Sequence, residues 1–252
     1  MFSKIGHQII VVESCLSTNT QLLNLIESDD VNDGAILMTH SQTNGRGQAG
    51  KWETNDGENL TFSFVLYPRF LKIADQFKLT QFVSLGIRNF LSAFLPKKSV
   101  KVKWPNDILV GDRKICGVLI ENQVQGSGLN QSVIGIGLNV NQDSFNLFDR
   151  PATSMKMETG KTFELLDVLD ELCKYLNQQY AILEQGRGDN LNQNYLNHLY
   201  QIDELKPYQV NGQLTRGKIK GVNEIGQLQF EEDSGQEWSL NLKEITFLSS
   251  DS

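Results

Sequence analysis

Short apolar stretches separated by turn residues dominate the first half of the chain, and their spacing predicts β-strands. Residues 7–15 form a β-rich run, and residues 34–41 have the near-continuous apolar character of a buried strand. Between residues 59 and 67, apolar Leu and Phe positions alternate with polar Thr and Ser, as in a strand with two different faces. Further strands are expected at residues 100–103, 108–110, 115–123 and 132–140, with Asp112–Arg113, after Gly111, as a hairpin tip.

Other segments place apolar residues three or four positions apart, which predicts amphipathic helices. The clearest spans residues 79–94, and Pro96 follows its end. A shorter helix is expected before residue 26, with Ser17 or Thr18 as its N-cap. Two more are expected at residues 161–183 and 190–199.

The pattern changes near residue 202. From Tyr208 onward the chain consists of short strands separated by turn signals such as Asn211-Gly212. About forty-five residues of this kind suit a small β-barrel. We therefore expect an α+β protein with a mixed sheet and helices in residues 1–202, followed by a β domain in residues 203–252.

The composition of the chain is typical of a globular protein and argues against several other classes. With 252 residues, 39% of them hydrophobic and 21% charged, the chain can bury a globular core. A net charge of -7 argues against a nucleic-acid surface, which needs clustered Lys and Arg. The three Cys residues show no metal-ligand spacing and no signal peptide precedes them, so we expect a cytoplasmic protein without a disulfide framework or zinc. No apolar run is long enough to cross a membrane.

The first candidate site is the Gly-rich segment 42–52, QTNGRGQAGKW. Its glycines free the backbone to present N–H groups to an anion, Arg46 can contact carboxylate or phosphate oxygens, and Trp52 supplies a flat apolar wall. The segment contains a GxGxxG spacing, but no amphipathic helix follows it, so we reject a dinucleotide-binding fold. Considered alone, a Gly-rich surface turn explains it equally well.

Two more polar clusters interrupt apolar strands. In the first, KWPND at residues 103–107, Pro105 must break the strand and leaves Asn106 and Asp107 able to bind a ligand or Mg²⁺, although a plain turn is the simpler alternative. In the second, residues 114–121, alternation places Cys116, Val118 and Ile120 on one face and Gly117, Leu119 and Glu121 on the other. Lys114 precedes this strand; it can stabilise a developing negative charge, or simply flank the strand in solvent.

Each cluster alone is weak, but their order and spacing together resemble the signature of biotin protein ligases. The series runs S-T-N, Q-T-x-G-R-G-x-x-G-x-W, K-W-P-N-D, K-x-x-G-x-L-x-E and G-x-G-x-N-V, and covers residues 17–141. The β-rich C-terminal segment is similar to the small SH3-like domain of that family. The resemblance implies the catalytic fold of biotin ligases, which is like that of class II aminoacyl-tRNA synthetases.

The resemblance also implies a role for each matching residue. Lys114 and Arg46 would be catalytic: Lys114 would bridge the reacting carboxylate and the α-phosphate of ATP, and Arg46 would close over the biotinyl phosphate. The biotin-binding residues would be Ser17, Thr18, Asn19, Gln42, Arg46, Gly47, Trp52 and Gly117. The ATP-binding and adenylate-binding residues would be Gly45, Gly50, Lys51, Asn106, Lys114 and Asn139, with Asp107 as a candidate metal ligand.

The implied reaction forms biotinyl-5′-AMP from biotin and ATP with Mg²⁺, then transfers biotin to a lysine of a carrier domain in a biotin-dependent carboxylase, with release of AMP. Three alternatives remain open: a lipoate or octanoate transfer enzyme, a non-catalytic sensor of biotin or nucleotide, and a structural interaction protein. A monomer and a homodimer are both compatible with the family, and no membrane partner is expected.

The chain departs from the best-known family pattern in two places. Gln48 and Ala49 stand where a doubly basic loop has two cations, so we expect faster release of the anionic adenylate. The first strand is expected to begin by Gln8, which leaves no room for an N-terminal helix-turn-helix. We therefore expect no specific binding to DNA.

Overall fold

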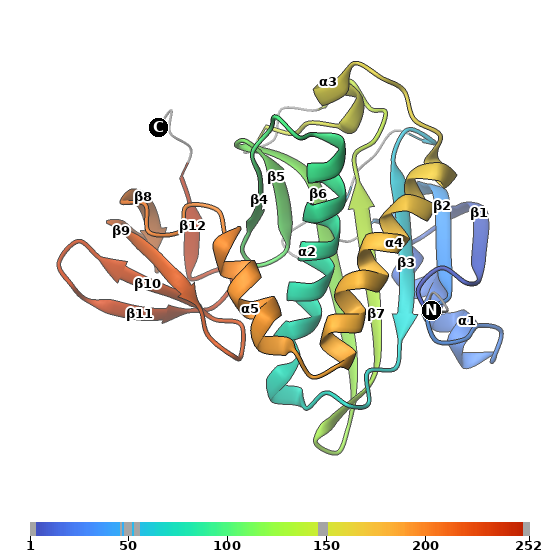
Figure 1. The fold of residues 1–252 in the computed structure, drawn as a ribbon, viewed down its shortest axis with the longest axis horizontal. Helices are drawn as coiled ribbons and strands as arrows, with labels where there is room; N and C mark the ends of the chain where they lie inside the picture. The colour runs from blue at the N-terminus through green and yellow to red at the C-terminus, as the bar shows by residue number, and fades with distance from the viewer. Residues whose placement is uncertain (1–3, 46, 48–51, 53–55, 146–150, 249–252) are drawn as a thin grey trace.

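The computed structural model describes residues 4–45, 47, 52, 56–145 and 151–248. Its larger part is built on a seven-stranded mixed sheet with the order β1-β2-β3-β7-β6-β5-β4 (Figure 1). β1 and β2 are parallel, and the remaining neighbours are antiparallel. The strands are β1 (Ile9–Cys15), β2 (Ile36–Gln42), β3 (Leu60–Leu66), β4 (Val100–Lys103), β5 (Asp107–Val110), β6 (Arg113–Gln125) and β7 (Gly128–Leu138).

Helices cover both faces of this sheet. The long helices α2 (Phe77–Phe94) and α4 (Leu165–Glu184) pack side by side over one face, and α5 (Gly188–Asn197) follows them toward the second sheet (Figure 1). Alternate strand residues such as Phe62, Ile136 and Cys116 point to this face and belong to the main core. The shorter α1 (Thr18–Glu27) contacts β2, β3 and β7, and its Leu22 joins a separate small core. Two short helical segments, η1 (Ile73–Asp75) and α3 (Met155–Thr159), lie in connections.

The C-terminal part is a five-stranded antiparallel sheet with the order β11-β10-β9-β8-β12. Its strands are β8 (Lys206–Val210), β9 (Gln213–Val222), β10 (Leu228–Glu232), β11 (Glu237–Leu240) and β12 (Ile245–Phe247). The ring of Tyr208 packs edge-on against Phe230 and Phe247, with centroids 5.2 and 5.5 Å away. The α+β class, with a mixed sheet followed by a small β unit, is thus confirmed, while the boundary at residues 202 and 203 stays a prediction.

Several elements differ from those expected from the sequence, and contacts between distant segments explain part of the difference. The helix expected from residue 161 begins at Leu165, because the N–H of Phe163 donates to Asn141 Oδ1 at 2.9 Å and holds the preceding chain extended. Sequence reasoning missed α3, whose first turn is capped by the Ser154 side chain accepting from Met157 N. The hairpin tip is Gly111–Asp112, one position earlier than expected.

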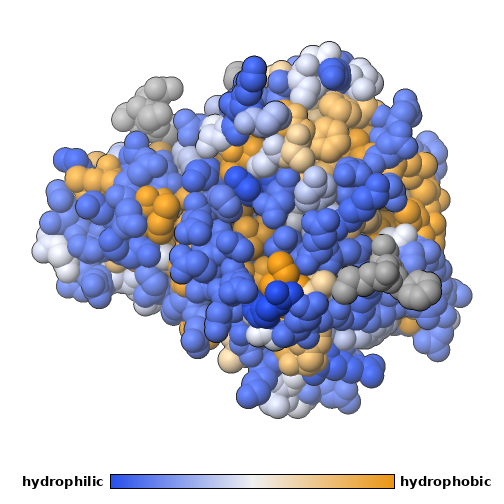
Figure 2. Space-filling model, in the orientation of Figure 1, coloured by the Kyte–Doolittle hydropathy of each residue, from blue (hydrophilic) through white to orange (hydrophobic). Residues whose placement is uncertain are grey.

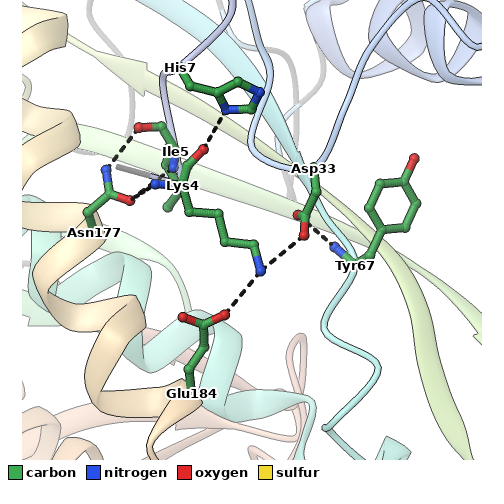
Figure 3. Close-up of polar contacts among 7 residues, drawn as sticks. All are labelled: Lys4, Ile5, His7, Asp33, Tyr67, Asn177 and Glu184. Atoms are coloured by element: carbon green, nitrogen blue, oxygen red, sulfur yellow. Dashed lines mark hydrogen bonds and ion pairs between the residues drawn. The ribbon is translucent and has the colours of Figure 1, made fainter. Parts of the chain in front are cut away.

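An ion-pair cluster anchors the first described residues to α4 (Figure 3). Lys4 Nζ lies 3.0 Å from both Asp33 Oδ2 and Glu184 Oε1, while Asn177 Oδ1 accepts from the N–H groups of Lys4 and Ile5 at 2.9 Å. Burial opposes the charge on Lys4, but hydrogen bonds to the two carboxylates outweigh it and raise the pKa of this ammonium. The anchor holds the chain in place just before it enters β1.

The surface is mostly hydrophilic on the face with α2 and α4 (Figure 2). Hydrophobic side chains gather at the right-hand edge of that view, where β1 and β2 lie in Figure 1. In β1, Ile9 and Val11 are 42% and 45% exposed. None of the helices in the described ranges is both long and apolar enough to cross a membrane.

Candidate active site

A row of small and polar residues crosses four strands on the sheet face opposite α2 and α4. The register aligns Thr61 of β3 with Gly137 of β7, Gly137 with Gly117 of β6, and Gly117 with Asp107 of β5. Because side chains alternate between the two faces of a strand, these four residues point the same way. The two glycines add no side chain, so other groups can lie directly against the strands here. We call the surface formed by Gly117 and Gly137 the glycine floor.

At one end of this floor, the start of α1 meets β2 and β3. Gln42 Oε1 accepts from the backbone N–H of Thr18 at 2.7 Å and from its hydroxyl at 3.2 Å. Ser63 Oγ lies 2.7 Å from Thr18 Oγ1 and 2.6 Å from Asn19 Oδ1. Asn19 in turn donates to Glu121 Oε2 at 2.6 Å. The structure therefore brings three predicted residues, Thr18, Asn19 and Gln42, into one partly buried polar cluster.

Ser17 lies beside this cluster as the N-cap residue of α1 and is 6% exposed. Its position as N-cap was predicted, but its side chain makes no capping hydrogen bond. Gly135 explains how the cluster fits against the sheet, since a Cβ there would clash with Asn19 Oδ1. The glycine in β7 is thus required by close packing.

The described residues of the Gly-rich loop bring an aromatic ring onto the floor. Trp52 N donates to Gly45 O at 3.1 Å, and the indole covers Gly137, where a Cβ would clash with the ring. Gly47 is exposed. The predicted residues Arg46, Gly50 and Lys51 lie outside the described part of the chain. Trp52 therefore lies on the same floor as the α1 cluster, as its expected role requires.

Lys114 and Asp107 lie at the other end of the floor. Lys114 Nζ is 2.6 Å from Asp107 Oδ1, and the two side chains are 32% and 19% exposed. The Lys114 side chain passes over Gly117, where a Cβ would stand 3.1 Å from Nζ, and Nζ lies 5.9 Å from the Trp52 ring centroid. The ammonium group thus lies over Gly117 and is paired with Asp107, a position that is compatible with the catalytic role expected from the sequence.

The two predicted asparagines differ in their surroundings. Asn106 hydrogen-bonds Val118 twice: its Nδ2 donates to Val118 O, and Val118 N donates to Asn106 O at 3.0 Å. Asn139 is only 4% exposed, and its Nδ2 donates to Thr153 O at 3.0 Å. Both amides therefore support local structure, and each has an Oδ1 atom whose acceptor capacity is separate from these donated bonds.

A cleft of about 260 Å³ borders the KWPND segment on the side of the second sheet. Trp104, Pro105 and Asn106 line one wall, and Ile225–Gln227 line another. Trp104 Nε1 donates to Gly226 O at 2.9 Å and joins the two sheets next to the cleft. The cleft is separate from the floor formed by Gly117 and Gly137, and its walls carry amide and apolar groups but no charged side chain.

Asp107 is the only candidate metal ligand that the sequence named. No group of three or more His, Cys, Asp or Glu side chains suited to a metal occurs in the ranges that the structure describes. A single carboxylate fits Mg²⁺ when the nucleotide supplies further oxygens, which is the usual arrangement for that ion. The donor set is therefore compatible with a magnesium-nucleotide complex.

Sequence reasoning missed three polar residues near the site. Ser63 was identified only as a polar strand position, and Glu121 only as a member of the face shared with Gly117. Glu158 gave no signal, because α3 itself was not predicted. Cys116, on the opposite face of β6, belongs to the core, and burial raises the pKa of its thiol.

Comparison with known proteins agrees with this arrangement. Residues 11–139, about half of the chain, match the family described as "Biotin/lipoate A/B protein ligase family". The chain is 26% identical over 180 residues to the bifunctional ligase/repressor BirA of Bacillus subtilis, covering 69% of this chain but only 54% of that protein. It is 24% identical over 217 residues to the biotin–[acetyl-CoA-carboxylase] ligase of Paracoccus denitrificans, covering 84% of this chain and 89% of that one.

A solved structure extends the likeness to nearly the full length. The biotin protein ligase from Aquifex aeolicus in complex with biotin and ATP superimposes with a TM-score of 0.78, covering 95% of this chain and 98% of that one at 24% identity. The chain thus shares that fold across both sheets, although it spans only about half the length of the Bacillus relative. With its motifs gathered on one sheet face and its family match covering that face, this chain belongs to the biotin/lipoate A/B protein ligase family.

Proposed function

We propose that this protein is an ATP-dependent biotin protein ligase. It forms biotinyl-5′-AMP from biotin and ATP and then joins biotin to a lysine of a carrier domain. The observation that carries the proposal is the position of Lys114 Nζ at one end of a glycine floor whose other end holds a cluster of hydroxyl and amide groups. A substrate with a polar head and a carboxylate tail would match these two ends.

The polar cluster suits the ureido ring of biotin. That ring has one carbonyl acceptor and two N–H donors, and hydroxyl and amide groups can serve as partners for both. Ser17, Thr18, Asn19 and Gln42 supply such groups from uncharged side chains. Glycines beneath the substrate and Trp52 beside it would contact the apolar part of the molecule.

Lys114 would act where the carboxylate of biotin approaches the α-phosphate of ATP. In the first step a carboxylate oxygen of biotin attacks the α-phosphorus of ATP, and the bond to pyrophosphate breaks. Carboxylate and phosphate repel each other, so an ammonium group between them lowers the barrier. Asp107 holds that ammonium by a 2.6 Å ion pair, and its carboxylate would also hold Mg²⁺, which supplies further charge neutralisation when bound with ATP.

The second step needs no nucleophile from the enzyme. The ε-amine of the acceptor lysine attacks the acyl carbon of the adenylate, the bond to AMP breaks, and the amine loses a proton as the amide forms. The Paracoccus relative is named for acetyl-CoA carboxylase, and we propose a carrier domain of such a biotin-dependent carboxylase as the acceptor. Arg46, Gly50 and Lys51 keep their proposed roles on the sequence alone.

The family also includes lipoate enzymes, and the polar cluster favours biotin over lipoate. The dithiolane ring of lipoate has no N–H or carbonyl group, so it cannot hydrogen-bond Thr18, Asn19 or Ser63, whereas a ureido ring can add bonds to those that these residues already make with one another. A site built to hydrogen-bond a substrate rejects analogues that lack the matching groups. We therefore expect strong discrimination against lipoate.

The deciding experiment incubates the protein with MgATP and a biotin-carrier domain, with biotin or lipoate in separate reactions. Intact mass spectrometry of the carrier should show the mass increase of one biotin and none of lipoate. Biotin-dependent exchange between ATP and pyrophosphate should accompany it. If neither exchange nor carrier modification depends on biotin, the proposed function is wrong.

A further inference from the structure

Glu158 of α3 is a buried carboxylate that has no role in the reaction proposed above. Its side chain is 1% exposed. Oε1 accepts from Thr153 Oγ1 at 2.6 Å and pairs with Arg113 Nη2 at 2.5 Å, while Oε2 pairs with Lys98 Nζ at 3.3 Å. A buried charge is costly unless it is paired and hydrogen-bonded, and these three partners meet that requirement.

Thr153, one partner of Glu158, contacts residues of the proposed active site. Lys114 N donates to Pro151 O and Thr153 N donates to Lys114 O, both at 2.9 Å, so residues 151–153 run beside the backbone of Lys114. The carbonyl oxygen of Thr153 also accepts from Asn139 Nδ2 at 3.0 Å. Thr153 thus contacts both Lys114 and Asn139, and Glu158 holds Thr153 by its hydroxyl group.

Arg113, the second partner of Glu158, restrains the chain next to Lys114. Arg113 precedes Lys114 in β6, so the ion pair with Glu158 fixes the chain on the N-terminal side of Lys114. The Arg113 and Lys98 side chains are 42% and 48% exposed and can turn into water if the carboxylate is removed. Without Glu158, neither Arg113 nor Thr153 would keep its present anchor.

We infer that Glu158 is a positioning residue for adenylate formation: through Thr153 and Arg113 it orients Lys114 and Asn139. The inference rests on the proposed function, because Lys114 and Asn139 are assigned there to the reaction. The binding of biotin's polar head does not depend on Glu158, since Thr18 and Gln42 are held by α1, β2 and β3. Loss of Glu158 should therefore slow chemistry and leave biotin affinity almost unchanged.

The test compares Glu158→Gln with wild type. Glutamine has nearly the same shape, so it keeps the buried volume and an acceptor for Thr153 while it removes the charge that holds Arg113. We expect kcat for biotin-dependent ATP–pyrophosphate exchange to fall about 10–100-fold, because small displacements of catalytic groups have effects of this order. The Kd of biotin should change less than twofold. Glu158→Asp, which keeps the charge, should recover part of the rate.

Lys156→Ala is the matched control. Lys156 lies on the same helix, but its ion pair with Asp143 is exposed, so the exchange rate should stay at the wild-type level. A merely structural role for Glu158 predicts a different pattern, in which the folded fraction falls while kcat per folded molecule stays constant. That pattern would overturn the inference.

Amide hydrogen exchange tests the inference without any catalysis. In Glu158→Gln the amides of Lys114 and Thr153 should exchange faster, while those of β1 and β2 should not change. Unchanged protection at Lys114 and Thr153 would overturn the inference whatever the enzyme does. If wild type fails to catalyse biotin-dependent exchange, the proposed function fails, and the protection data still decide whether Glu158 positions this segment.

Discussion

Lys114 Nζ lies 2.6 Å from Asp107 Oδ1, and the ion pair spans the register position at which Asp107 faces Gly117 across β5 and β6. The glycine matters here because its missing side chain lets the lysine turn back over its own strand. An ammonium that would otherwise extend into solvent is therefore held over the sheet face that carries the other family motifs.

We expect Lys114→Ala to abolish biotin-dependent ATP–pyrophosphate exchange, since the variant loses the ammonium group that lies against Gly117 in the glycine floor. Removing a preorganised charge from a reaction of this type commonly lowers the rate by about 10²–10³-fold. Because the side chain is partly exposed, the protein should remain folded by circular dichroism. Lys174→Ala, which removes an exposed lysine on α4, is the control. Near-normal exchange in Lys114→Ala would refute the catalytic role.

We expect Gly137→Ala to displace Trp52 from the sheet, because the added Cβ would clash with the indole ring. Both biotin affinity and tryptophan fluorescence should change. Titration of the variant with biotin, followed by fluorescence, measures both effects. Gly128→Ala in the same strand is the matched control, because a Cβ there makes only ordinary contacts of 3.6 Å or more. Equal biotin affinity in Gly137→Ala and wild type would mean that Trp52 does not contact the substrate.

We expect Gln48→Arg to lengthen the half-life of the enzyme-bound adenylate. This prediction comes from the sequence, since Gln48 lies outside the described residues. A hydrogen bond to an ionised group is worth about 1–3 kcal/mol, which is enough to slow release of an anion about tenfold or more. The half-life is measured by rapid gel filtration of enzyme loaded with labelled biotin and MgATP. Equal half-lives of the adenylate in Gln48→Arg and wild type would contradict this prediction.

We expect stability to fall as the pH drops below about 6.5, in part because of His198. Burial, followed by repulsion from Arg88 and Lys101, lowers the pKa of its imidazole from the ordinary 6.5 in the folded protein. Below pH 6.5 the unfolded chain therefore binds a proton that the folded chain resists, and the balance moves toward unfolding. Above that pH the ring is neutral in both states and contributes nothing.

The measurement is the free energy of unfolding by urea at pH 7.5 and pH 5.5, for wild type and His198→Asn. The variant should lose less stability between the two pH values than wild type does. Parallel losses would show that the acid sensitivity arises elsewhere in the chain.

Local patterns in the sequence were sufficient for much of the fold. The apolar spacing of residues 79–94 predicted α2 nearly to its ends, and alternation placed Gly117 and Cys116 on opposite faces of β6. These properties depend on the periodicity of one element, so neighbouring residues are enough to reveal them. The family motifs likewise named Thr18, Gln42 and Lys114 as candidate site residues, because each motif is a contiguous segment.

Contacts between distant segments could not be derived in that way. Asp107 was expected to hold a metal, and only the pairing of β5 with β6 brings its carboxylate to Lys114. Glu158 carried no sequence signal, because a five-residue helix has too few turns to show a period. The sequence by itself thus determined most of the elements, the family and the candidate chemical groups. The tertiary structure decided which groups meet, because the pairing of strands and the packing of α3 depend on residues far apart in the chain.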